Sequence, residues 1–511
     1  MIPRRAALAK GPRAGRYGLA VPDERPNILL IVSDEERRTD WLQGYADLPA
    51  HDRLSADGLT SSGHYTHSSP CSPSRASLFT GQYLSQHGVV DNVSFPAHRA
   101  LDHDIPTIGR LLRDQGYESA YLGKWHLDHG DTPDMAAHGY SGWEGNDVHF
   151  TGNPWTGRHF DPIIAEQACA WIRSRPTDRP WFLTVALVNP HDIMWYPADH
   201  PTHQAAHPTD KEAFDFLQSF RLGDLMIDTL QEGYPERFSE LPANFDDDLH
   251  TKPDVQRIWR HVRNREHFVG SMEGATERTW LRYLDYYAWL HELLDDSVGT
   301  ILGALDDAGI YDDTTIVYTS DHGDACGSHG LRAKLPCIYE EVMGVPLVVK
   351  APGVTPGSTT TALSTSVDVA TTICALGGVD VDTTPSLKGR DLSPTLADPT
   401  IAVRDWIYLA QDSAQSELLR MCRYAYRGFF DGTTKYARYF GIGGGVDRTG
   451  AVAPEPKVFD VDASFDDQEH EWYDLRDDPH ELRNLAGDRA RRGEVRDLHQ
   501  RLLEIEASEL A

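Results

Sequence analysis

The chain has 511 residues, 40% of them hydrophobic and 25% charged, which is long enough for two domains or for one large domain with a smaller one. Its net charge of −30 argues against nucleic acid or an anionic membrane surface as a partner, and no apolar stretch is long enough to span a bilayer. The six cysteines are widely scattered, which does not resemble a disulfide framework and favours a cytoplasmic location.

The first elements of the chain are a tail and a buried strand. Residues 1–24 are predicted to be a disordered basic tail, because no apolar segment follows the arginine-rich start. Residues 26–33 form a nearly continuous apolar run, the pattern of a strand that is buried on both faces of a parallel sheet. Asp34 and Glu35 follow directly, so two carboxylates stand at the carboxyl end of this strand.

The most informative stretch is residues 71–81, which read Cys-Ser-Pro-Ser-Arg-Ala-Ser-Leu-Phe-Thr-Gly. Pro73 suits the first turn of a helix and either neighbouring serine could cap it, so Cys71 is expected at the positive end of a helix. An anionic ester is favoured at such a position. Arg75 lies four residues later, one helical turn away. The alternative is a buried cysteine that precedes a surface helix.

Two further strands are predicted to deliver basic side chains. Residues 119–127 read as a strand in which a period of two places Lys124 and His126 on one face. Residues 181–188 have the pattern of another buried strand, and His191 follows shortly after it. The competing interpretations are a strand with two solvent-facing polar residues and a histidine that packs in a loop.

The later part of the chain adds a second acidic pair. A helix is predicted over residues 277–308, and residues 314–320 form an apolar strand that ends at Asp321 and His322. Because ligands of open α/β sheets gather at the carboxyl ends of strands, this pair and the pair at 34–35 are candidates for one metal site. Oxygen-rich ligation suits Ca²⁺, our preferred ion, or Mg²⁺, and the imidazole of His322 admits Mn²⁺.

Residues 71–81 resemble the maturation signature of the type I, formylglycine-dependent sulfatases. In that family a separate formylglycine-generating enzyme oxidises the cysteine to Cα-formylglycine, whose hydrated aldehyde attacks sulfur. The resemblance implies the alkaline-phosphatase-like α/β fold, a large mixed and mostly parallel sheet flanked by helices. It implies a catalytic domain at residues 25–385 and a smaller α+β domain at 386–511, where residues 471–485 resemble the family's terminal motif.

The resemblance also implies roles for single residues. Lys124 would bind a sulfate oxygen, His126 would act on the formylglycine hydroxyl, and His191 would contact the substrate. A lysine near the sulfate and the leaving oxygen is matched by Lys334, with Arg332 as the weaker alternative. The candidate catalytic residues are therefore Cys71, Arg75, Lys124, His126, His191 and Lys334.

The implied metal ligands are Asp34, Glu35, Asp321 and His322. The late pair matches one version of the family's pattern, whereas the early pair departs from it because the family commonly has Asp or Gln where Glu35 stands. Whether Glu36 or Asp40 replaces it as a ligand is open at this stage.

Three interpretations compete. The first is a sulfatase acting on a small-molecule or carbohydrate sulfate ester, with aryl, alkyl, choline and carbohydrate sulfates all open. The second is a phosphonate monoester or phosphodiester hydrolase on the same scaffold, which Lys124 and His126 disfavour because those enzymes generally lack the pair. The third is a catalytically silent binding protein, which nothing supports because every expected polar position is occupied. The oligomeric state is open, an oligomer included.

Overall fold

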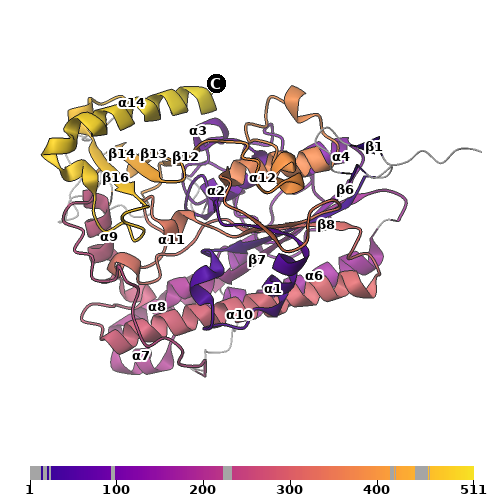
Figure 1. The fold of residues 1–511 in the computed structure, drawn as a ribbon. Coiled ribbons are helices and arrows are strands. Elements are labelled where there is room, and N and C mark those ends of the chain that lie inside the picture. The colour runs from indigo at the N-terminus through magenta and orange to yellow at the C-terminus, as the bar shows by residue number, and fades with distance from the viewer. Residues whose placement is uncertain are drawn as a thin grey trace, which may run out of the picture.

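A large helix-flanked sheet and a smaller antiparallel sheet make up the computed structural model of the chain (Figure 1). It describes residues 13–14, 20–21, 25–93, 98–175, 177–222, 233–414, 419, 422–442, 458–459 and 461–511. The tail expected at residues 1–24 lies mostly outside the described residues. Within it, Arg13–Ala14 (β1) and Ala20–Val21 (β2) pair as antiparallel strands, so these four residues depart from the expected disorder.

The large sheet has seven strands in the order β10-β4-β9-β8-β3-β7-β6. Four neighbouring strands, β8, β3, β7 and β6, are mutually parallel, while β9 is antiparallel to both of its neighbours. The parallel strands are β3 (Asn27–Asp34), β6 (Glu118–Gly123), β7 (Trp181–Pro190) and β8 (Thr314–Ser320), and the others are β4 (Leu59–Ser61), β9 (Leu347–Lys350) and β10 (Ser358–Thr360). The predicted mixed and mostly parallel sheet is confirmed, and its four parallel strands share one carboxyl edge.

The central strand β3 is buried on both faces, as its apolar run predicts. Ile28, Leu30 and Val32 pack into one hydrophobic cluster, whereas Leu29 and Ile31 pack into another on the opposite side. The first cluster lies under α2 (Cys71–Thr80), α4 (Ile108–Asp114) and α12 (Ser366–Leu376), and the second is covered by α1 (Pro49–Asp57), α6 (Thr156–Ser174) and α10 (Glu277–Asp307). Figure 1 shows these two helical layers above and below the sheet. Helix α10 matches the helix predicted at 277–308.

The strand predicted at residues 119–127 is shorter in the structure. Strand β6 ends at Gly123, which has a φ of +87°, and His126 has a φ of +59° in the loop that follows. The period-of-two argument for Lys124 and His126 was therefore wrong, since neither residue belongs to the strand. A left-handed turn positions them instead.

The smaller unit is an antiparallel sheet with one long helix. Strand β14 (Thr434–Ile442) pairs with β13 (Ala425–Phe430), β15 (Val458–Phe459) and β16 (Glu469–Asp474), and β12 (Ile407–Gln411) completes the sheet. Helix α14 (Arg492–Glu509) lies over β12, β13 and β14 (Figure 1). Leu387, Leu392 and Leu396 pack into the core of the large sheet, so the chain just after residue 386 adjoins the first domain.

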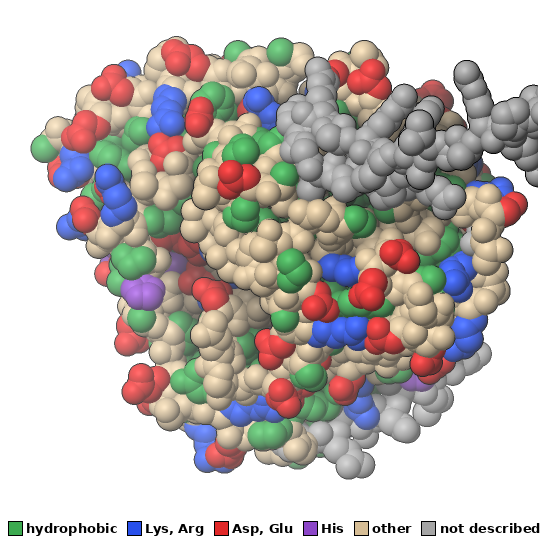
Figure 2. Space-filling model, turned by 45° about the vertical axis from the view of Figure 1, so that its right-hand side comes forward, with side chains coloured by type: hydrophobic (Ala, Val, Ile, Leu, Met, Phe, Trp, Pro, Cys, Tyr) green, Lys and Arg blue, Asp and Glu red, His purple; other side chains and the backbone are tan. Residues whose placement is uncertain are grey.

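Figure 2 shows how charged side chains are distributed over one face of the molecule. Figure 2 shows acidic and basic side chains interspersed over one face, with hydrophobic side chains between them. In the described part of the chain, no helix combines the length and apolar character needed to cross a bilayer.

Truncation of the fully buried Leu30 tests the double-sided burial of β3. We expect Leu30→Ala to lower the free energy of unfolding by about 2–5 kcal/mol, because it leaves a cavity that the sheet cannot close. Ile163→Ala in α6 is the control, since that side chain is 44% exposed and should change stability by no more than about 0.5 kcal/mol. Thermal melting measures the stability of both variants. Equal losses of stability would contradict the burial of β3 on both faces.

Candidate active site

Helix α2 places Cys71 as its first residue, at the helix N-terminus as predicted. The expected serine cap is absent, because the N-cap residue is Pro70, which makes no side-chain cap. The serines bind distant loops instead, since Ser72 Oγ donates to the carbonyl of His126 at 2.6 Å and Ser74 Oγ donates to the carbonyl of Asp321. The signature is thus a helix whose first turn is tied to two of the strand-end loops.

Arg75 joins the acidic strand ends to each other. Its Nε donates to Asp321 Oδ2 at 2.9 Å, and one terminal nitrogen donates to Asp34 Oδ2 at 2.8 Å. The other terminal nitrogen donates to the carbonyl oxygen of Lys124 at 2.9 Å. All of these side chains are buried, so the guanidinium fixes the carboxyl ends of β3, β8 and β6 relative to Cys71.

The loop after β6 brings a lysine and a histidine to this edge. Lys124 Nζ lies 2.6 Å from Asp34 Oδ2. The carboxylate of the buried Asp147 accepts the backbone N–H groups of Trp125 at 2.8 Å and His126 at 2.9 Å, which holds the left-handed turn. Sequence reasoning missed Asp147, because no motif spacing links it to the residues it supports.

His191 and Lys334 meet at Glu35. His191 follows β7 directly, and its Nε2 lies 3.5 Å from Glu35 Oε2 and 3.8 Å from Asp34 Oδ1. Lys334 Nζ donates to Glu35 Oε2 at 2.7 Å. The alternative, Arg332, instead donates to the backbone carbonyls of Tyr196, Arg263 and Gly270. Its guanidinium therefore holds neighbouring loops together.

The four predicted metal residues lie together beside Cys71. Its Sγ is 3.7 Å from Asp34 Oδ1 and 3.2 Å from His322 Nε2, and one donor atom each from Asp34, Cys71, Asp321 and His322 falls within 4.8 Å of the others. Asp34 also belongs to a second group, in which one donor atom each from Asp34, Glu35 and His191 lies within 4.8 Å of the others. All ten predicted site residues are at most 4% exposed. Side-chain contacts join nine of them in one buried cluster, and the backbone of the tenth, His126, adjoins it through hydrogen bonds with Ser72 and Asp147.

This cluster fits a divalent cation. Among the described residues, Glu35 Oε1 and Asp324 Oδ2 are buried oxygens without a hydrogen-bond partner. Burial, which outweighs the nearby Lys334, raises the pKa of Glu35 well above its usual value. Buried carboxylate oxygens without a donor are costly, and they are the ligands that Ca²⁺, Mg²⁺ and Mn²⁺ prefer. Asp324 was missed from sequence, although its place three residues after Asp321 was a usable signal.

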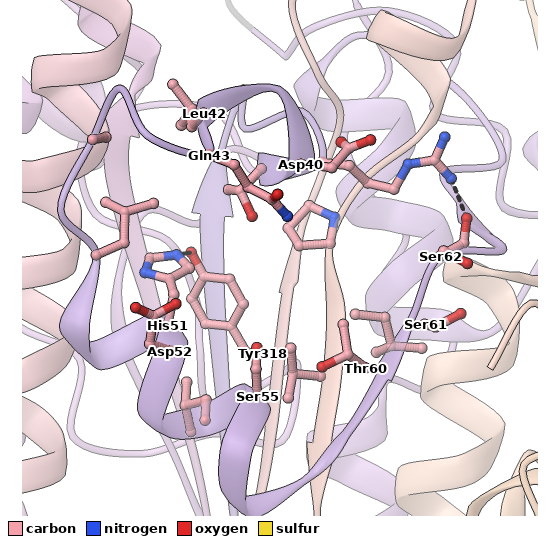
Figure 3. A pocket seen from close by; sticks show the side chains of 18 of the residues that line it. Asp40, Leu42, Gln43, His51, Asp52, Ser55, Thr60, Ser61, Ser62 and Tyr318 are labelled. Atoms are coloured by element: carbon pink, nitrogen blue, oxygen red, sulfur yellow. Dashed lines mark hydrogen bonds between the residues drawn. The ribbon is translucent and has the colours of Figure 1, made fainter. Parts of the chain in front are cut away.

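Glu36 and Asp40 do not compete with Glu35 for this cluster. The side chain of Glu36 turns to the opposite side of the strand end, where it accepts hydrogen bonds from Ser33 and Tyr318 and lies 3.3 Å from His51 Nε2. Asp40 lines a separate cavity of about 620 Å³, where Figure 3 shows His51 beside the Tyr318 ring. None of the ten predicted site residues, all in the described part of the chain, lines that cavity.

The protonation states follow from burial and neighbouring charges. Burial would raise the pKa of Asp34, but Lys124, His191 and Arg75 together hold it well below its usual value. Burial and the lysine at 124 lower the pKa of His126 well below its usual value, so its imidazole is neutral. Burial and the charge of Asp34 raise the pKa of the Cys71 thiol. An unmodified Cys71 is therefore a poor nucleophile, because reactivity of cysteine requires the thiolate.

The fold and this cluster define a hydrolase of the alkaline-phosphatase-like type. The family model described as Sulfatase matches residues 26–379, more than two thirds of the chain, and the chain belongs to that family. It is a sulfuric ester hydrolase. It is 26% identical to the N-acetylglucosamine-6-O-sulfatase of Bacteroides thetaiotaomicron, over 91% of this chain and 83% of that protein.

Solved structures share the fold over nearly the whole chain. One, determined in complex with its substrate D-glucosamine-2-N,6-O-disulfate, has a TM-score of 0.68 at 22% identity and covers 95% of this chain and 98% of that one. The phosphonate monoester hydrolase of Agrobacterium radiobacter has a TM-score of 0.68 at 20% identity and covers 95% and 96%. At these identities the likeness establishes the fold and does not separate the two reactions.

Removal of one carboxylate tests the metal cluster. We expect Asp321→Ala to lose the bound divalent ion and to lower activity roughly 10²–10³-fold, because one ligand and one partner of Arg75 disappear together. Asp313→Ala, an exposed carboxylate just before β8, is the matched control. Elemental analysis of both purified variants gives the answer, and a full complement of metal in active Asp321→Ala would refute the ligand set.

Proposed function

We propose that this enzyme hydrolyses a carbohydrate sulfate ester with a formylglycine made from Cys71, beside a Ca²⁺ ion held by Asp34, Glu35, Asp321 and His322. The observation that carries the proposal is the position of Cys71 at a helix N-terminus, within 3.2 Å of His322 and 3.7 Å of Asp34. A formylglycine at this position would supply a hydroxyl nucleophile that a buried thiol with a raised pKa cannot supply.

The cationic side chains supply the electrostatic part of the reaction. A sulfate monoester brings negative charge, and bond cleavage builds more on the leaving oxygen, so buried cations must stabilise both. Lys124 and Lys334 flank the acidic cluster from two different loops and provide that charge. A divalent ion, when bound, polarises a sulfate oxygen as a Lewis acid.

Two neutral imidazoles provide for proton transfer. Burial, Lys334 and Lys124 lower the pKa of His191 well below its usual value, and His126 shares this depression. His191, beside Glu35 and Lys334, is assigned to the leaving oxygen, to which its neutral imidazole would donate a hydrogen bond while the ammonium of Lys334 supplies the proton. His126 follows Lys124 in the loop fixed by Asp147 and is assigned to the hydroxyl of the residue at position 71.

The substrate class rests on the named relatives. The relative from Bacteroides thetaiotaomicron is an N-acetylglucosamine-6-O-sulfatase, and a solved neighbour holds a sulfated glucosamine. A phosphonate monoester is the second candidate, because a phosphonate monoester hydrolase matches the fold equally well. Lys124 at 2.6 Å from Asp34 favours the sulfate. The domain limits 25–385 and 386–511, the maturation enzyme and the cytoplasmic location are proposals that rest on the sequence.

Paired kinetics test the proposal. The same preparation is assayed on N-acetylglucosamine 6-sulfate and other carbohydrate sulfates, choline sulfate, an aryl sulfate and an aryl phosphonate monoester. The proposal predicts the highest kcat/KM for a carbohydrate sulfate. If the phosphonate monoester is preferred, the enzyme is a phosphonate monoester hydrolase, the second candidate. If choline sulfate or the aryl sulfate is preferred, the enzyme is still a sulfatase, but its substrate is not a carbohydrate sulfate.

Maturation gives a prediction about a single residue. When the protein is produced with an active formylglycine-generating enzyme, Cys71 should be converted to formylglycine, and Cys71→Ala should abolish turnover because no nucleophile remains. Peptide mass spectrometry of residues around position 71 reports the conversion. Cys326→Ala, another buried cysteine, is the control and should stay active. Fully active enzyme with only a thiol at position 71 would exclude the mechanism.

Substitution of Lys124 and substitution of His126 should have different kinetic effects. Lys124→Ala is expected to lower kcat/KM by a factor equivalent to about 2–4 kcal/mol, the scale of one preorganised electrostatic donor. His126→Ala should release about one equivalent of leaving group in a rapid burst and then turn over slowly, because only the later step lacks its base. Stopped-flow assays with an aryl sulfate distinguish them. The absence of a burst in His126→Ala would remove that residue from its assigned step.

A further inference from the structure

A second group of metal-ligating side chains lies outside the active site. Two loops contribute His103, Asp128 and His138, and one donor atom from each lies within 4.8 Å of the others. The Nε2 atoms of both histidines face the same carboxylate oxygen: His138 is 3.2 Å and His103 is 3.9 Å from Asp128 Oδ1. The two imidazole rings are nearly perpendicular, with centroids 4.7 Å apart.

These separations are close to those between the ligands of one tetrahedral ion. Zinc binds nitrogen and oxygen at about 2.0–2.2 Å, which places neighbouring ligand atoms of a tetrahedron about 3.3–3.5 Å apart. The distance of 3.2 Å from His138 Nε2 to Asp128 Oδ1, which is also a hydrogen bond, is about 0.1 Å below this spacing. The distance of 3.9 Å from His103 is too long for a hydrogen bond. Because the His103 side chain is 50% exposed, a small rotation brings its Nε2 into ligating range.

The other two ligands are already held in place. The backbone N–H of Asp134 donates to Asp128 Oδ2 at 3.1 Å, which orients the carboxylate and leaves Oδ1 toward the histidines. The His138 ring is fully buried against Trp125, and among the described residues its hydrogen-bond partner is Asp128. A backbone hydrogen bond of 2.9 Å from Leu101 to Leu127 keeps the two loops adjacent. Among the described residues Nδ1 of His138 has no hydrogen-bond partner, so packing against Trp125 orients this ring, whereas Asp128 has a supporting hydrogen bond of the kind that metal ligands usually have.

A similar cluster elsewhere in the described chain has a carboxylate that accepts more hydrogen bonds. His203, His207 and Asp210 also lie within 4.8 Å of one another. Both oxygens of Asp210 are committed, however: Oδ2 accepts from His203 at 2.8 Å and from the Ser271 backbone at 2.8 Å, and Oδ1 accepts from His267 at 2.6 Å. Asp210 thus accepts three hydrogen bonds, compared with the two at Asp128 from Asp134 and His138.

We propose that His103, Asp128 and His138 form a Zn²⁺ site that is separate from the catalytic metal. The two imidazoles favour Zn²⁺ over Ca²⁺, the carboxylate is a ligand that Zn²⁺ also accepts, and three protein ligands leave a coordination position for solvent. Asp128 follows His126 by two residues, so the ion fastens the loop that carries Lys124 and His126. In this position the ion would tie the catalytic loop to the loop around residue 103.

Titration with Co²⁺, a spectroscopic substitute for Zn²⁺, tests the site. The full-length protein is kept in excess Ca²⁺, which occupies the catalytic cluster, and visible absorption of tetrahedral Co²⁺ is followed. We expect one equivalent of Co²⁺ to bind with this spectrum and Zn²⁺ to displace it. His103→Ala and Asp128→Asn should each weaken binding at least tenfold. Because His103 is half exposed, its variant should fold normally.

His129→Ala is the matched control, since it removes an exposed histidine of the same loop and should leave binding unchanged. A second readout is thermal melting, in which Zn²⁺ should raise the Tm of the wild type and of His129→Ala but not of His103→Ala. Equal Co²⁺ binding by wild type and His103→Ala would overturn the proposal. So would Co²⁺ binding that is lost in His203→Ala and retained in His103→Ala.

Discussion

The buried guanidinium of Arg75 is the contact on which the catalytic edge depends. It donates to Asp34, to Asp321 and to the carbonyl of Lys124, and so joins the ends of three parallel strands to the helix that begins with Cys71. A charge at this depth is stable only when paired, because the transfer of one unpaired ion from water costs several kcal/mol. The strand ends, the helix and the guanidinium therefore have to form together.

The same constraint explains how an acidic protein handles an anionic substrate. A net charge of −30 repels anions at long range, yet the catalytic edge concentrates Arg75, Lys124 and Lys334 around the carboxylates. Each cation is tied to an acid, so the cluster is locally compensated before any ion binds. A divalent ion bound there would shift the net charge of the cluster to positive, which favours a sulfate ester. Selectivity for anions is thus local to this edge.

The sequence predicted the features of this site that are encoded in contiguous residues. Apolar runs identified β3, β7 and β8, and their carboxyl ends gave Asp34, His191 and Asp321, because strand burial is encoded in contiguous residues. Long-range and left-handed features were not accessible in this way. The turn at His126 was misread as strand, because it depends on a hydrogen bond to Asp147, 21 residues away. The serines of the signature were misread as caps for the same reason, since their partners come from distant segments.

Anomalous diffraction from a crystal of the mature enzyme tests the central claim most directly. With Mn²⁺ in place of the native ion, the account predicts one strong anomalous peak within about 2.5 Å of oxygens of Asp34 and Asp321, next to a formylglycine at position 71. The Nε2 of His322 should lie on the same peak. The absence of a peak between Asp34 and Asp321, with the Arg75 bridge intact and an unmodified cysteine in active enzyme, would contradict the account.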